Sequence, residues 1–388
     1  MKKQTIFAAF LLVNVLCVNR LFAQNNELAV KHVVVYHEKG MFGGWPANFG
    51  IWNWDNELLV GFAKGSYKDL GPERHNIDRE KPEFHLLARS LDGGESWQIE
   101  DPGKTDNGAL FVPNHGSYHG VERTDVQLRE VVDPIAINFG DPNLVLTARM
   151  TNTNGGDSWL WHSYDRGKTW KGPSTLPLFG TLGIAARTDY IIDGKDECML
   201  FLTAAKADGK EGRVMCVKTT DGGKNWSFVS WIGPEPEGYA IMPAAVRLSD
   251  SEILITIRRN KFISCYKSAD NGLTWTALPN PVDDTGEGNP PAMIKMEDGR
   301  VVLVYGSRKK PFSICAKISD DHGETWSTAY ILRDDGSGRD IGYPQVIQRP
   351  DGKVVAIYYF MDEKTGPERY IGATIWTPPA SGNSLPKN

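Results

Sequence analysis

The stretch SDDHGETW, Ser319 to Trp326, recurs four more times in this chain in altered form. The related stretches are SLDGGESW from Ser90, SYDRGKTW from Ser163, TTDGGKNW from Thr219 and SADNGLTW from Ser268. All five share a Ser or Thr, an Asp two residues later, a Gly two residues after that, and a Trp at the eighth position. The His and the additional acids of the first stretch vary between copies. Only the shared positions need a common explanation.

The shared residues are typical of a tight turn. A Ser or Thr followed by an Asp can bond backbone N–H groups ahead of it, and Gly accepts a positive φ angle. Alternating apolar residues precede each copy, as in FSICAKIS, and strand-like residues follow it, as in STAYIL. We therefore interpret each copy, called a box below, as the tip of a β-hairpin rather than as a catalytic cluster.

A second repeat alternates with the boxes. Six segments place an Asp-containing turn before an apolar strand: WDNELLVGFAK, GDPNLVLTARM, IDGKDECMLFLTAAK, SDSEILITIRRN, EDGRVVLVYGSR and PDGKVVAIYYF. Boxes roughly 50 to 75 residues apart suit propeller blades with loop insertions. The sequence therefore predicts an all-β, six-bladed β-propeller of four-stranded antiparallel blades, forming a single domain over residues 24–388. We expect LAVKHVVVY, residues 28–36, to complete the last blade and close the ring.

Composition narrows the class of protein further. A net charge of −5 over 388 residues gives no footprint for nucleic acid. The 40 Gly and 23 Pro suit many turns between short strands. Beyond residue 23, four cysteines lie in apolar runs without metal-ligand spacing, which favours buried thiols; a Cys198–Cys216 disulfide is the alternative if their strands are neighbours. The other two are Cys265 and Cys315.

The N-terminal residues are typical of a secretory signal peptide. Two lysines precede an apolar run from Ile6 to Val18, and a small residue, Ala23, stands before Gln24. The run is shorter than the roughly 20 residues that span a bilayer. We expect residues 1–23 to be removed and the protein to be exported to the periplasm or the extracellular space, without a membrane span.

Repeated boxes of this form resemble those of the sialidase superfamily, whose propellers carry bacterial neuraminidase repeats, or Asp boxes. In that family a Tyr activated by a Glu attacks the sugar, and an Asp acts as acid and base. The resemblance implies Tyr343 in IGYPQ as the nucleophile, Glu237 in EGYAIMP (rather than Glu235) as its partner, and Asp78 in GPERHNIDREKPEF as the acid/base. These are roles assigned by position.

Cations end the second strand of five blades, where a propeller's ligands gather around the axis. They are Lys64, Arg149, Lys206, Arg258 or Arg259, and Arg308. Lone lysines at strand ends are usually solvated. Arginines that converge on one axis repel each other unless an anion lies among them, so they predict a carboxylate, sulfate or phosphate on the ligand.

The family resemblance implies three arginines around the substrate carboxylate. Arg258 or Arg259 would be the second and Arg308 the third. The first is missing, because GMFGGWP has Trp45 before the Pro. Trp45 is either a core residue or a flat face for a sugar ring. The candidates to replace the missing cation are Arg79, Arg149 and Arg187.

Histidines in the long loops give no metal pattern. His75, His115 and His119 lack a second ligand type at fixed spacing, so we interpret them as surface residues and expect neither metal nor cofactor. The expected function is an exported, exo-acting, retaining glycoside hydrolase that acts on a glycan with a terminal acidic sugar. Two alternatives stay open: a glycan-binding propeller that has lost catalysis, and a uronic-acid hydrolase or lyase on the same scaffold.

Overall fold

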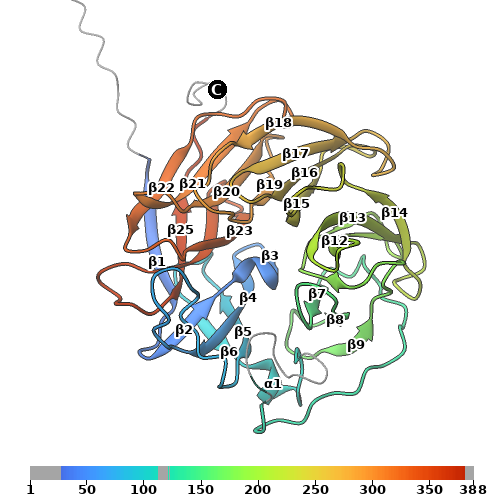
Figure 1. The fold of residues 1–388 in the computed structure, drawn as a ribbon, viewed down its shortest axis with the longest axis horizontal. Helices are drawn as coiled ribbons and strands as arrows, with labels where there is room; N and C mark the ends of the chain where they lie inside the picture. The colour runs from blue at the N-terminus through green and yellow to red at the C-terminus, as the bar shows by residue number, and fades with distance from the viewer. Residues whose placement is uncertain (1–27, 112–120, 122, 381–388) are drawn as a thin grey trace, which may run out of the picture.

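The computed structural model describes residues 28–111, 121 and 123–380. Six antiparallel sheets surround a central axis as the blades of a propeller (Figure 1). The predicted fold class is therefore confirmed. The predicted signal peptide, residues 1–23, lies outside the described residues, and among those described no helix is long and apolar enough to cross a membrane.

The first three blades differ in their inner strands. Blade 1 contains β2 (Met41–Gly44), β3 (Ile51–Trp54), β4 (Glu57–Ser66), β5 (Phe84–Ser90) and β6 (Gln98–Glu100), with the 3-10 turn η1 (Pro46–Asn48) between β2 and β3. A short helix, α1 (Pro102–Thr105), follows β6. Blade 2 contains β7 (Val145–Met150), β8 (Ser158–Ser163) and β9 (Lys171–Thr175). Blade 3 contains β10 (Ile184–Ala185), β11 (Tyr190–Ile192), β12 (Cys198–Ala205), β13 (Glu211–Thr219) and β14 (Ser227–Trp231).

The last three blades each have four strands. Blade 4 contains β15 (Ile241–Arg247), β16 (Ile253–Arg258), β17 (Ile263–Ser268) and β18 (Thr276–Val282). Blade 5 contains β19 (Ala292–Lys295), β20 (Val301–Ser307), β21 (Phe312–Ser319) and β22 (Tyr330–Gly336). Blade 6 contains β23 (Gly342–Gln348), β24 (Val354–Phe360), β25 (Tyr370–Trp376) and, as its outer strand, β1 (Val30–Tyr36).

The N-terminal strand closes the ring, as the sequence predicts. β1 pairs with β25 in antiparallel register from Val30 opposite Trp376 to Tyr36 opposite Ile371. The edge of the last blade is therefore covered by the first strand of the described chain. Blade 2 departs from the four-stranded pattern, since its described sheet has three strands. In blades 1 and 3 the inner strand is broken into two short pieces that pair with the same neighbour.

Each box forms the hairpin tip that the sequence predicts. In the fifth box the Ser319 hydroxyl donates to Asp321 Oδ1 and accepts the Gly323 N–H, both at 2.8 Å, and Asp321 Oδ1 accepts the Thr325 N–H at 2.9 Å. The same three bonds recur in the other four boxes. Two consecutive residues adopt positive φ, as with His322 (58°) and Gly323 (89°).

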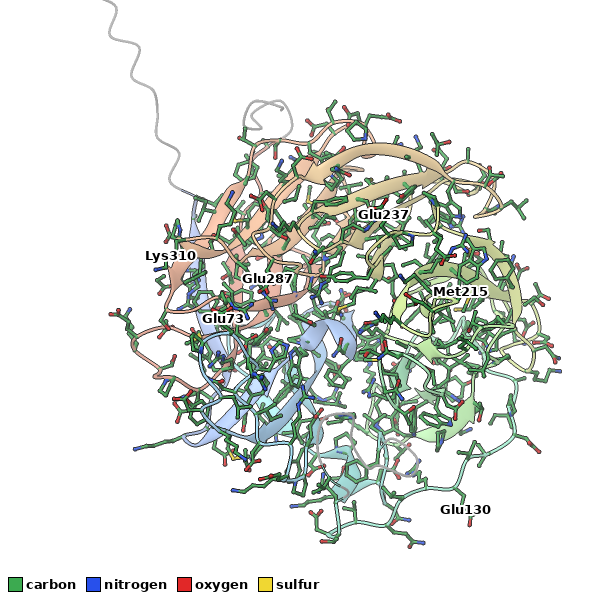
Figure 2. All side chains as sticks on the ribbon, in the orientation of Figure 1. Glu73, Glu130, Met215, Glu237, Glu287 and Lys310 are labelled. Atoms are coloured by element: carbon green, nitrogen blue, oxygen red, sulfur yellow. The ribbon has the colours of Figure 1, made fainter. Side chains whose placement is uncertain are left out.

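The boxes also join neighbouring blades. A Cβ added to Gly323 would lie 2.6 Å from Leu254 Cδ1 in the preceding blade, and one added to Gly167 would lie 2.8 Å from Leu59 Cδ2. The absence of a side chain at the box Gly therefore lets the turn pack directly on the blade before it. Side chains fill the spaces between blades (Figure 2). The four described cysteines are buried free thiols, so the default interpretation holds and the disulfide alternative does not.

We predict that the Ser at the start of a box stabilises the fold. Ser319 is fully buried, and Ser319→Ala would remove the acceptor of the Gly323 N–H and one of the donors to the Asp321 carboxylate. The free energy of unfolding should fall by about 1 to 3 kcal/mol, measured by urea titration of Trp fluorescence. The exposed neighbour Asp320, changed to Ala, should shift it by less than about 0.5 kcal/mol. Equal effects of the two changes would contradict this role.

Acid should weaken the boxes. Although partial burial raises the pKa of Asp92, its bonds to Ser96 and Ser90 lower it to about 2, and bonds to Asn225 lower the pKa of Asp221 to about 2. A pKa depressed in the folded state gives stability that is present above the unfolded pKa and is lost as pH falls through the folded value. Unfolding free energy should thus decline between about pH 4 and pH 2. Asp221→Asn should make that decline shallower in urea titrations; an unchanged slope would contradict the assignment.

Candidate active site

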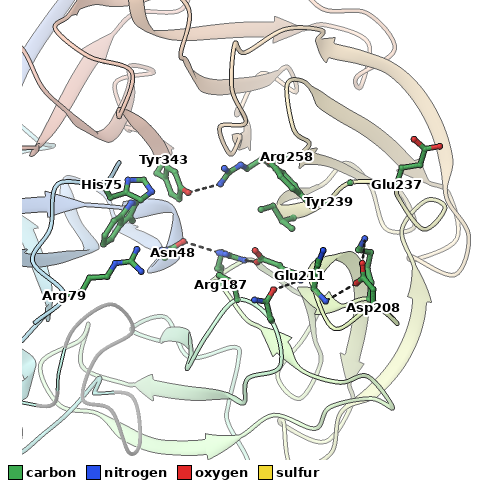
Figure 3. A pocket seen from close by; sticks show the side chains of 17 residues that line it. Asn48, His75, Arg79, Arg187, Asp208, Glu211, Glu237, Tyr239, Arg258 and Tyr343 are labelled. Carbon is green, nitrogen blue, oxygen red and sulfur yellow. Dashed lines mark hydrogen bonds and ion pairs between the residues drawn. The ribbon is translucent and has the colours of Figure 1, made fainter. Parts of the chain in front are cut away.

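The candidate site lies at the end of the blades opposite the boxes. Ser268, which begins a box, pairs with Ile253 at the start of β16, whereas Arg258 ends the same strand. Around such strand ends are two adjoining hollows: a main hollow of about 770 Å³ and a side hollow of about 490 Å³. They share a wall made of four side chains: His75, Arg79, Tyr239 and Arg258. Figure 3 shows the main hollow.

Three inner segments near the main hollow share one backbone irregularity, a positive φ at the residue before a Pro. Trp45, Met242 and Tyr343 each precede a Pro and adopt φ of 57°, 50° and 50°. The register of the sheet shifts at Met242 and at Tyr343, which marks a β-bulge. Bulges re-aim side chains and are frequent beside active sites. The recurrence of a bulky residue before Pro was readable from the sequence but was missed there.

Tyr343 and Arg258 form the centre of the floor. Arg258 Nη1 donates to the Tyr343 hydroxyl oxygen at 2.8 Å and lies 3.5 Å from Met242 Sδ (Figure 3). Arg258 Nε is buried and has no hydrogen-bond partner among the described residues. Burial opposes the charge of Arg258, but the neighbouring Tyr343 and Tyr239 raise its pKa above its usual range. The guanidinium is therefore a permanent cation with bonding capacity to spare.

Arg308 lies beside this pair in the side hollow. Its guanidinium is 5.8 Å from the ring of Tyr343 and donates to Tyr359 Oη at 3.1 Å. The nearest carboxylate contact is with Asp340, at 3.9 Å, which is too long for a hydrogen bond. Arg308 Nε has no partner among the described residues. The guanidinium groups of Arg258 and Arg308 thus lie 5.4 Å and 5.8 Å from the Tyr343 ring.

Further cations line the main hollow from blades 1 and 3. Arg187 donates to Glu211 at 2.6 Å and to Asn48 at 3.2 Å, so its charge is already paired. Arg79 is exposed, forms no ion pair or hydrogen bond with the described residues, and points into the hollow (Figure 3). Of the candidates to replace the missing arginine, Arg79 is the one with its charge available. Glu211 was not identified from the sequence, where no motif marks it.

The predicted partners of Tyr343 are not brought to it. Glu237 lies on the outer edge of the main hollow, is exposed, and points away from Tyr343 (Figure 3). Asp78 lines neither hollow and is bonded to the Glu80 N–H and to Lys68 at 3.3 Å. The backbone N–H of Glu80, followed by Lys68, lowers the pKa of Asp78, which makes it a poor proton donor near neutral pH.

Three other predicted binding residues are occupied elsewhere. Arg259 donates to the Tyr239 carbonyl and lies 5.2 Å over Phe262, and it lines neither hollow. Arg149 is buried against Phe49, and burial lowers its pKa to about 9. Trp45 is only 1% exposed, so the core alternative holds, although its surface borders the main hollow.

The histidine that sequence reasoning set aside is part of the site. His75 lines both hollows and is bonded to Asp340 at 2.7 Å. Its partner is 265 residues away in the sequence, so no local pattern marks the pair. His115 and His119 lie outside the described residues. Among the described residues no group of three or more His, Cys, Asp or Glu side chains is arranged to hold a metal ion.

Comparison with known proteins agrees with this architecture. Residues 132–356 match the family described as BNR repeat-like domain. A Paenibacillus xyloglucanase is 29% identical over 298 residues, and the match covers 67% of this chain but 28% of the xyloglucanase. This chain therefore spans little more than a quarter of that relative.

Two solved structures share the fold. A Dyadobacter fermentans protein of unknown function superposes with a TM-score of 0.67 at 18% identity, over 90% of this chain and 99% of that one. The Trypanosoma rangeli sialidase in complex with sialic acid gives a TM-score of 0.55 at 14% identity, over 89% of this chain and 59% of that one. At these identities the likeness concerns the fold.

We predict that Arg258, and not Arg259, binds an anionic sugar. Arg258→Met keeps the length of the side chain but removes a charge-assisted contact of about 1.5 to 3 kcal/mol, which corresponds to about 10- to 150-fold weaker binding. Calorimetric titration with glucuronate, galacturonate and N-acetylneuraminate measures this. Arg259→Met is the matched control and should change the Kd less than about threefold. Equal losses in the two variants would contradict the assignment.

Proposed function

This chain belongs to the BNR repeat-like domain family, and on that premise we propose that it is an exported glycoside hydrolase acting on a glycan with a terminal acidic sugar. The signal-peptide pattern of residues 1–23 supports export. The sialidase that shares the fold and the xyloglucanase that shares sequence are both carbohydrate-active by their names, which supports a glycan as the substrate. The hollow at the axis suits the end of a glycan chain.

One observation supports an acidic sugar as the ligand. Arg258 is a half-buried cation whose buried Nε has no partner among the described residues, Arg79 lines both hollows and Arg308 lines the side hollow. The nearby acids do not neutralise them, since Glu211 is paired with Arg187, and Asp340 is 3.9 Å from Arg308. A carboxylate on the sugar would supply the missing acceptor through charge-assisted bonds. The combination of buried donors and cations favours an acidic ligand over a neutral one.

Tyr343 is the proposed reacting group. Its hydroxyl oxygen is at the floor of the main hollow, 2.8 Å from Arg258 Nη1. A guanidinium at this position would stabilise negative charge that develops on the phenol oxygen, in the way that preorganised donors do in other enzymes. A neutral phenol that becomes the nucleophile avoids placing a carboxylate against an anionic sugar. In this proposal Arg258 takes over part of the activating role that the sequence analysis gave to Glu237.

A second candidate is a uronic-acid lyase. It is favoured by the absence, among the described residues, of a carboxylate hydrogen-bonded to the Tyr343 hydroxyl. In a lyase Tyr343 would move a proton, and the arginines would stabilise charge on the substrate carboxylate. The products separate the candidates, because elimination leaves an unsaturated ring that absorbs ultraviolet light and hydrolysis does not.

We predict that Tyr343→Phe abolishes turnover while binding persists. The change removes one hydroxyl and preserves the ring, so kcat should fall at least about 100-fold on the best substrate of a screen of sialosides and uronosides. Released sugar and ultraviolet absorbance are measured together, and calorimetry checks that the sugar still binds. Tyr164→Phe, in a box on the rim, is the matched control and should retain activity.

The outcomes discriminate between functions. Full activity in Tyr343→Phe would contradict the proposed role of the tyrosine. Glycan binding with no product from the unaltered protein would instead support a propeller that binds glycans without cleaving them. An unsaturated product would replace the hydrolase by the lyase.

A further inference from the structure

His75 is held in a defined orientation at the junction of the two hollows. It belongs to the loop between β4 and β5. Its Nδ1 lies 2.7 Å from Oδ1 of Asp340, a residue that comes just before β23 in the sequence. Its side chain is 30% exposed, whereas that of Asp340 is 5% exposed. The ring meets Trp45 edge-on at 5.1 Å and lies 6.5 Å from the ring of Tyr343 (Figure 3).

Asp340 is the acceptor of this bond. Burial would raise the pKa of Asp340, but His75, Arg369 and Arg308 together hold it well below the usual range of an Asp. Arg369 Nε donates to it at 3.1 Å, and the Tyr359 hydroxyl donates as well. The carboxylate can therefore only accept, so Nδ1 of His75 carries a hydrogen. The second ring nitrogen, Nε2, is then the one that can exchange a proton.

The exchanging nitrogen belongs to a ring that lines the site. His75 lines both hollows, and its Nε2 has no hydrogen-bond partner among the described residues. Other titratable and charged groups surround the ring. Asp340 contacts it directly, and the groups next to Asp340 are Arg308, Arg369 and Tyr359. The remaining groups that line the two hollows near it are Tyr343, Tyr239, Arg79, Arg258, Glu73, Arg74, Glu287 and Arg339.

The same loop contains the residue that the sequence analysis nominated for proton transfer. Asp78 is three residues from His75, but it is bonded to Lys68 and to the Glu80 N–H and lines neither hollow. A general acid must reach the leaving oxygen and must hold a proton near the working pH. His75 lines both hollows, and imidazole is the side chain that ordinarily exchanges protons near neutral pH, whereas Asp78 lines neither hollow and is a carboxylate bonded to donors.

We propose that His75 is the general acid and base of this site and that Asp340 positions it. The inference rests on the proposed hydrolase. In the first step the bond from the anomeric carbon to the leaving oxygen breaks, and its electron pair and the Nε2 proton of His75 go to that oxygen. The Tyr343 oxygen bonds to the anomeric carbon in the same step, and its proton passes to water. In the second step a water oxygen bonds to the anomeric carbon and gives a proton to Nε2 of His75, while the bond to the Tyr343 oxygen breaks with its electron pair on that oxygen, which regains a proton from water. The sum is one glycoside plus one water giving two sugars, with His75 restored.

The test compares two leaving groups in two variants. His75→Asn should lose about 10²- to 10⁴-fold in kcat/KM on a methyl glycoside of the acidic sugar, because methanol is a poor leaving group that needs protonation. On the 4-nitrophenyl glycoside, whose leaving group needs no proton, the loss should be less than about tenfold. Asp78→Asn should match the unaltered protein on both substrates. His322→Asn, in a box at the far end of the blade, controls for loss of a histidine.

Two results would overturn the inference alone: equal losses on both substrates in His75→Asn, or the leaving-group effect appearing in Asp78→Asn. An unaltered protein that cleaves no glycoside would overturn the proposed function and the inference with it. Nitrogen NMR of the histidines gives a readout without turnover. The signal absent from His75→Asn should show a hydrogen on Nδ1, and a hydrogen on Nε2 alone would contradict the orientation by Asp340.

Discussion

The packing of each box against the blade before it is the contact on which the ring depends. The Ser–Asp–Gly turn is held by its own side-chain bonds, and its bare glycine allows a leucine of the neighbouring blade to approach, as Leu254 approaches Gly323. A sheet alone has two open faces, and stacking blades around an axis buries both. With β1 paired to β25, the ring is closed, and the inner strands have a fixed relation to one another.

Because the inner strands are fixed, a shared backbone irregularity, a positive φ before a Pro, places specific side chains at the candidate site. Trp45, Met242 and Tyr343 all adopt positive φ before a Pro, a conformation that costs free energy for a bulky residue. The ring can hold such strain because each inner strand is paired to a buried neighbour in its own sheet. The side chains of the three residues make different contacts. Trp45 is buried in the core, Met242 contacts Arg258 through its sulfur, and the Tyr343 hydroxyl accepts a hydrogen bond from the same arginine. One local geometry thus yields a core residue, a sulfur contact to Arg258 and a hydroxyl bonded to the same arginine.

The sequence predicted what repeats and missed what does not. Five boxes and six Asp turns predicted the number of blades, strand ends placed Arg258 or Arg259 and Arg308 near one axis, and the family resemblance nominated Tyr343. Glu237 and Asp78 were assigned by position in a family pattern, but a loop residue can face the site or leave it within two or three positions. His75 and Asp340 meet across the gap between blade 1 and blade 6, and such a pair depends on ring closure rather than on local sequence. Arg149 lies next to the last residue of β7, near the predicted strand end, yet its guanidinium is buried over the ring of Phe49.

Asp340 contacts both the histidine and one of the arginines of the candidate site. A buried carboxylate is costly unless its oxygens are bonded, and here the donors are His75, Arg369 and the hydroxyl of Tyr359. These donors satisfy Asp340 at short range and leave Arg308 at 3.9 Å, bonded to neutral oxygens instead. The same carboxylate therefore orients the imidazole and leaves the neighbouring arginine without a close counter-ion. In the proposed function, the carboxylate of an anionic sugar would pair with Arg308 and Arg258, and Asp340 would hold His75 in position for proton transfer to the glycosidic oxygen.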